Sequence, residues 1–234
     1  MTKRWSIAAL LLAIIVVLSS TPFSYASARA DEVSLIVLEL KGGSKQITVL
    51  AVPQQDDSTT NPDYKLLPYH WQTTAQYWIN PSNKYGFSAS ALIFVLTSSA
   101  NTWDEKTSYS VFVYKGTTSR SAGRRDGYNV ISFGVYQAGA IAVTYIWYNR
   151  YTSSIVETDT RLNTRYKWSL SGEAGKMDVQ NIMTHEFGHW CGLDDLYSDV
   201  DYWLTMYGYA DYGETYKRDL GLGDILGLQA IYGS

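Results

Sequence analysis

Residues 185–195 of this 234-residue chain read HEFGHWCGLDD, and this stretch decides most of what the sequence predicts. Residues four apart on an α-helix differ by about 40° around the axis, so the imidazoles of His185 and His189 project from one face. Two imidazoles on one face can hold a single metal ion, and zinc is commonly bound in this way. Glu186 lies about 100° further round, beside the ion, where a general base belongs.

A catalytic zinc site needs three protein ligands and one open position, so a third ligand must follow the helix. Gly192 accepts the left-handed backbone conformation that ends helices, which lets the chain turn back and bring Asp195 to the metal. The neighbouring Asp194 is the alternative ligand. We favour Asp195 because it keeps the spacing of the extended motif, and we expect Asp194 to support the ligands instead.

The pattern HExxHxxGxxH/D with a later methionine turn resembles the metzincin metallopeptidases, and among them the matrixins. Residues 204–208, LTMYG, resemble the methionine turn, and residues 224–233 resemble the matrixin terminal helix. The likeness extends over roughly residues 69–233, and it is specific only towards the C-terminus. It implies an α+β fold with a twisted mixed β-sheet, an active-site helix, a methionine turn and a C-terminal helix.

Three departures from the matrixin pattern affect the site. Matrixins usually place histidine where this chain has Asp195, and an aspartate there is similar to snapalysin-type metzincins. The cysteine-switch propeptide is missing, since Cys191 lies within the helix. Only His70 remains to supply a second, structural zinc, so we predict one catalytic zinc. Calcium is compatible with such domains, although no loop shows a recognisable calcium pattern.

The first thirty residues are typical of a signal peptide. Lys3 and Arg4 precede an apolar run at residues 7–18, and small residues with two Ala-x-Ala sites follow. The run is shorter than the roughly 20 residues that span a membrane, so cleavage and secretion are favoured over an uncleaved anchor. Removing residues 1–30 leaves 16 basic and 22 acidic residues, because Lys3, Arg4 and Arg29 fall within them. Nucleic acid is therefore not expected as a partner.

The remaining sequence divides at a polar linker. Apolar residues 35–40 and 47–52 flank Gly-Gly-Ser, so residues 31–63 are predicted to form a β-hairpin followed by the linker, serving either as a short propeptide or as an added hairpin. Residues 64–234 are predicted to form a single catalytic domain. Its expected strands are residues 77–80, 111–114, 128–133, 140–148 and 155–162, and its expected helices are residues 88–103, 178–191 and 223–231.

These residues predict a secreted zinc-dependent endopeptidase in which Glu186 serves as general base. By similarity to matrixins, a peptide or protein substrate would bind in an extended conformation along an exposed edge strand at residues 140–148. No stable membrane association is expected. The alternative is a secreted non-catalytic binding protein that retains a metalloprotease fold, and the intact Glu186 argues against it. A purely structural zinc is disfavoured because three ligands leave a position open.

Overall fold

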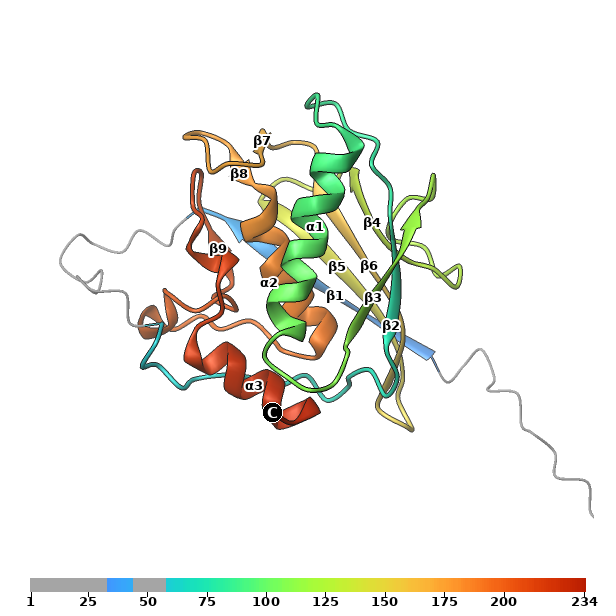
Figure 1. Ribbon diagram of the computed structural model, residues 1–234, viewed down its shortest axis with the longest axis vertical. Coiled ribbons are helices and arrows are strands. Elements are labelled where there is room, and N and C mark those ends of the chain that lie inside the picture. The colour runs from blue at the N-terminus through green and yellow to red at the C-terminus, as the bar shows by residue number, and fades with distance from the viewer. Residues whose placement is uncertain (1–32, 44–57) are drawn as a thin grey trace, which may run out of the picture.

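The computed structural model describes residues 33–43 and 58–234, drawn in colour in Figure 1. The predicted signal peptide at residues 1–30 and the predicted second hairpin strand at residues 47–52 lie outside the described residues. Within the described part of the chain, no helix has the length and apolar character needed to cross a membrane.

Within the described residues, seven strands form one mixed sheet in the order β3-β2-β4-β6-β5-β1-β9. The strands β2, β3, β4 and β6 are mutually parallel, while β5 runs antiparallel to both β6 and β1. The five strands predicted from residue 77 onwards are confirmed as β2 to β6. The bounds are β1 (Val33–Gly42), β2 (Ala75–Ile79), β3 (Phe112–Thr117), β4 (Asn129–Gly134), β5 (Ala140–Asn149), β6 (Ser154–Asn163) and β9 (Tyr209–Ala210), with a separate pair β7 (Trp168–Ser169) and β8 (Met177–Asp178).

The three predicted helices are confirmed as α1 (Ala89–Asp104), α2 (Val179–Cys191) and α3 (Leu222–Tyr232). Figure 1 shows α1 and α2 side by side in front of the sheet. Ser88 caps α1 by accepting from the Ala91 N–H at 3.2 Å, and Asp178 caps α2 by accepting from the Asn181 N–H at 2.9 Å. Short 3₁₀ turns occupy Asp199–Asp201 and Tyr216–Arg218. The α+β class is confirmed.

Aromatic packing sets the rotation of α2 about its axis. Phe187 and Trp190 are fully buried, and both rings contact Tyr77 of β2 and Phe112 of β3 with centroids 4.9–6.3 Å apart. Burying each such ring contributes about 1.5–3 kcal/mol or more, so this face of the helix is held firmly against the core. The histidines at 185 and 189 are thereby directed to a different side of the helix.

The strand β1 lies inside the main sheet. It pairs with β5 from Val33 opposite Asn149 to Lys41 opposite Ala140, and it also pairs in parallel with β9. The prediction that residues 140–148 form an exposed edge is wrong, because β6 occupies one side of β5 and β1 the other. Periodicity identifies a strand in a sequence but does not reveal its neighbours, so the pattern could not disclose this pairing.

Candidate metal centre

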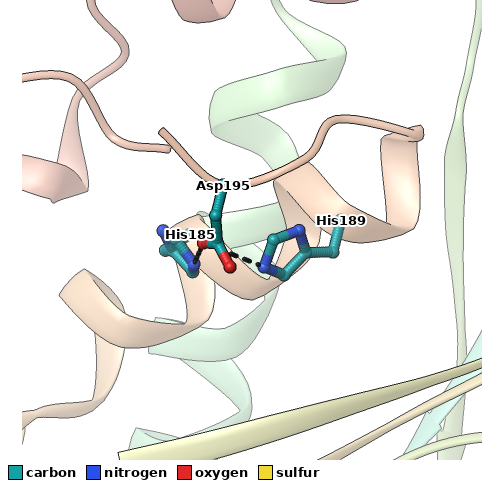
Figure 2. Close-up of side chains that lie close together, drawn as sticks. All are labelled: His185, His189 and Asp195. Carbon is teal, nitrogen blue, oxygen red and sulfur yellow. Dashed lines mark ion pairs between the residues drawn. The ribbon is translucent and has the colours of Figure 1, made fainter. Parts of the chain in front are cut away.

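The side chains of His185, His189 and Asp195 point toward one another (Figure 2). The two histidines come from α2, and Asp195 comes from the segment after it. Oδ1 of Asp195 lies 3.2 Å from Nε2 of His185 and 3.6 Å from Nε2 of His189. Ligand atoms bound about 2.0–2.2 Å from a tetrahedral ion lie roughly 3.3–3.6 Å apart. The spacing therefore suits zinc, and among the described residues this is the group of histidine and acidic side chains that could hold a metal.

The backbone fixes which nitrogen of each histidine faces the centre. Nδ1 of His185 lies 2.7 Å from the Thr205 carbonyl, and Nδ1 of His189 lies 2.9 Å from the Leu193 carbonyl. A carbonyl only accepts hydrogen bonds, so each Nδ1 carries the proton and each Nε2 keeps its lone pair. Both Nε2 atoms and Oδ1 of Asp195 are buried without a hydrogen-bond partner. Unpaired buried polar atoms are costly, and one cation would satisfy all three, so the residues present fit a metal ion.

The charge state of Asp195 depends on its neighbours. Burial alone would raise its pKa, but His189 and His185 in their protonated forms outweigh that effect and lower the pKa to about 2. The hydroxyl of Tyr197 donates to Oδ2 at 2.9 Å, which leaves Oδ1 facing the histidines. Tyr197 thus orients a carboxylate that the sequence pattern marked, although nothing in that pattern singled out the tyrosine itself.

Asp194 faces a different partner. Its Oδ2 lies 2.6 Å from Nζ of Lys65, and its Oδ1 accepts from the Asp195 backbone N–H at 2.9 Å. The turn that separates the two aspartates begins at Gly192, whose φ of 104° is left-handed as predicted. The structure therefore brings Asp195, and not Asp194, beside the histidines. The role of Asp195 as a ligand stays a prediction.

Glu186 is fully buried beside the three candidate ligands, and its two oxygens differ. Oε2 accepts from the Thr144 hydroxyl at 2.5 Å, whereas Oε1 has no partner. Thr144 is 2.6 Å from the Thr160 hydroxyl, which in turn accepts from Nε1 of Trp190 at 2.8 Å. The indole can only donate, so the hydrogen bonds run from Trp190 through both threonines to the carboxylate.

Burial raises the pKa of Glu186 to about 7, although His189 and the Thr144 hydrogen bond oppose the shift. A carboxyl group with a pKa near neutrality is suited to accepting a proton and returning it. Sequence reasoning missed Thr144. The available signal was a hydroxyl residue within the otherwise apolar first half of β5, and such a signal is weak without knowing that α2 packs on that strand.

Asp224 holds the backbone of the methionine turn, residues 204–208. This buried carboxylate accepts from the backbone N–H groups of Thr205 at 2.8 Å and Met206 at 3.0 Å. Since the Thr205 carbonyl accepts from His185, Asp224 also fixes the orientation of that imidazole. The sequence predicted only that residue 224 would lie at the start of the C-terminal helix. Its contact with the turn depends on how α3 packs.

Gly188 permits the close approach of the turn to α2. A Cβ built on Gly188 would lie 2.1 Å from Sδ of Met206 and 2.8 Å from the Trp103 ring. We expect Gly188→Ala to lower the free energy of unfolding by about 1–3 kcal/mol, because overpacking outweighs the gain in helix propensity of about 1 kcal/mol. Chemical denaturation would measure this change. Gly134→Ala is the control, because its Cβ meets only the flexible Arg161 side chain, and an equal loss there would contradict the packing explanation.

Two other residues considered from the sequence lie outside this centre. Cys191 is free and fully buried, and burial raises the pKa of its thiol well above its ordinary value. This placement suits a packed side chain more than a reactive one. The ring of His70 packs edge-on against Tyr232 at 6.1 Å, and His70 pairs with Ser154 through its backbone.

Comparison with known families supports the likeness seen in the sequence. The family model of the matrixins, peptidase family M10, matches residues 139–233. This range runs from the glycine before β5 through α2 and the methionine turn to the end of α3. The matrixin resemblance is confirmed over these residues, and the fold is metzincin-like. Because matrixins are zinc metallopeptidases, the match supports a peptidase family and a zinc ion. No curated protein gives a significant match to the chain.

Proposed function

We propose that this matrixin-like chain is a secreted, zinc-dependent endopeptidase with His185, His189 and Asp195 as ligands and Glu186 as general base. The convergence of three unpaired buried ligand atoms beside an unpaired carboxylate oxygen carries the proposal. Secretion rests on the predicted signal peptide alone. Zinc bound here would supply a Lewis acid that polarises the scissile carbonyl and acidifies water.

The residues of the chain then handle the proton. Oε1 of Glu186 is free to accept a proton from the attacking water while Thr144 holds Oε2 in place. Water oxygen adds to the carbonyl carbon, the C–N bond breaks, and Glu186 returns the proton to the departing nitrogen. The carboxylate ends the cycle as it began, and no covalent intermediate with the protein is required. As a metal ligand, the carboxylate of Asp195 would remain ionised throughout.

Metal removal tests this proposal directly. The zinc-loaded full chain should cleave internal bonds of casein or of a quenched fluorescent peptide during long incubation at high enzyme concentration. Dialysis against a chelator should reduce the rate at least about 100-fold, and stoichiometric zinc should restore it. Mass spectrometry of the products would locate the cleaved bonds. If the zinc-loaded chain cleaves nothing, both in its unmodified form and as the Lys41→Pro variant, the result would instead favour the non-catalytic binding protein.

A further inference from the structure

The strand β1 occupies the side of β5 along which a peptide substrate would be expected to lie. Peptide recognition at a sheet edge requires free backbone N–H and C=O groups, and β1 pairs with those of β5 from residue 140 to residue 149. It runs antiparallel to β5 and parallel to the two residues of β9. Residues 33–42 thus add one extended segment of chain where an incoming extended peptide would add another.

The C-terminal half of β1 lies between β5 and β9, the short strand that follows the methionine turn. On one side, Leu38 pairs with Thr144, whose hydroxyl donates to Glu186. On the other side, the Lys41 N–H donates to the Gly208 carbonyl at 3.3 Å, and a Cβ on Gly208 would be 3.1 Å from Oδ1 of Asp195. The segment 38–42 therefore lies against β5, whose Thr144 bonds to the proposed base, and against the methionine turn beside Asp195.

Side chains fix the register of this segment. Oε1 of Glu39 accepts from the Tyr136 hydroxyl at 2.7 Å and from Gln137 at 2.6 Å. Leu40 is fully buried and lies opposite Ala142, two residues from Thr144, so Leu40 and Thr144 project from the same face of the sheet. Gly42 approaches so closely that a Cβ there would lie 2.7 Å from the Tyr166 hydroxyl. One apolar side chain, that of Leu40, is therefore enclosed on the face of the sheet that carries Thr144.

Apart from Leu40, the side chains of β1 are exposed or only partly buried, with Ile36 and Leu38 packed against the core. Leu40 is the only buried residue among its ten, and the side chains of Leu35 and Val37 are exposed. By contrast, seven of the ten residues of β5 are buried, as its interior position in the sheet requires. Few buried apolar contacts are characteristic of segments that open locally at low free-energy cost. At the same time Glu186 and both histidines have no exposed surface, so a substrate reaches them only after something moves.

We propose that β1 is an intramolecular, substrate-like inhibitor that fills the cleft of the proposed peptidase and must leave before a substrate binds. The inference rests on the proposed function, and it adds a side-chain preference. The pocket that holds Leu40 is expected to accept a leucine-sized apolar side chain of the substrate. Glu39 and Lys41 on either side are not enclosed in this way.

A binding experiment tests whether β1 fills the cleft, and it does not require hydrolysis. The probe is a fluorescent peptide with the sequence of residues 33–43, titrated into the full chain carrying Glu186→Gln so that it is not cut. With Leu40 in place the peptide should not bind. Adding Leu40→Asp should expel β1, because the pocket would bury an unpaired carboxylate, and peptide binding measured by anisotropy should rise at least about tenfold. Leu35→Asp is the matched control, since the same change on the exposed face should leave the cleft closed.

The peptide itself tests the pocket. A peptide with aspartate at the position of Leu40 should not bind the opened chain, whereas one with aspartate at the position of Leu35 should bind it. Lys41→Pro gives a second route to the open state, because proline removes the N–H that bonds to Gly208. Lys41→Ala keeps that N–H and is its control. If circular dichroism shows that Leu40→Asp and Lys41→Pro both unfold the chain, β1 is an integral strand and the inference is overturned.

The outcomes separate this inference from the proposed function. Equal peptide binding and equal hydrolysis by the unmodified, Leu40→Asp and Lys41→Pro chains would overturn the role of β1 while leaving the peptidase intact. If the opened chains bind the peptide but cleave no substrate when Glu186 is restored and zinc is loaded, the inference stands and the proposed function falls. Activation of hydrolysis at least about tenfold by Lys41→Pro, and not by Lys41→Ala, would support both.

Discussion

Glu186→Gln is expected to abolish peptide hydrolysis while leaving one zinc ion bound per chain. The amide has nearly the same shape as the carboxyl group, and its oxygen can still accept from the Thr144 hydroxyl, but it cannot take up the proton of the attacking water. Loss of a general base costs about 10² to 10⁴ in rate. The three proposed ligands are untouched, so metal analysis after dialysis should give the same zinc content as the unmodified chain.

The comparison is made in both the unmodified sequence and the Lys41→Pro chain, so that occupation of the cleft by β1 does not conceal the effect. Glu157→Gln is the matched control. Glu157 is a buried glutamate on β6, and its carboxylate accepts from the N–H groups of Asp126 and Gly127. The Glu157→Gln chain should have a lower free energy of unfolding but should still hydrolyse the peptide. Hydrolysis by Glu186→Gln at the unmodified rate would remove Glu186 from the role of base.

The part of the centre that could be predicted from sequence depends on local geometry. Helical spacing alone places His185 and His189 on one face, and a glycine after the helix allows the chain to reverse. Both expectations need only residues within one continuous stretch of chain. The helices and the strands β2 to β6 were predictable for the same reason, since their periodicity and caps are local.

The part that could not be predicted depends on contacts between distant segments. Thr144 reaches Glu186 across 42 positions of sequence, and Asp224 reaches the methionine turn across 18 or 19. Neither contact has a sequence pattern of its own, because it follows from how α2 packs on β5 and how α3 packs under the turn. The pairing of β1 with β5 is another case, since many strands could have matched its alternation.

The two adjacent aspartates differ in what each carboxylate faces, and the difference predicts opposite results for the same substitution. Asp195→Ala would leave only His185 and His189 at the centre, fewer ligands than a stable catalytic zinc requires, so zinc should dissociate on dialysis and hydrolysis should disappear. Asp194→Ala removes the ion pair with Lys65 and a hydrogen bond to the Asp195 N–H. Zinc should be retained there, with at most about a 10- to 100-fold loss in affinity or rate.

Metal analysis of the dialysed variants decides between the two residues independently of activity. The structure favours Asp195 because its Oδ1 is buried, unpaired and 3.2 Å from Nε2 of His185, whereas Asp194 is already paired with a lysine. Circular dichroism should show both variants folded, since each changes one side chain beyond the end of α2. Zinc kept by Asp195→Ala and lost from Asp194→Ala would transfer the ligand role to Asp194, and the turn at Gly192 would then have to deliver the other carboxylate to the metal.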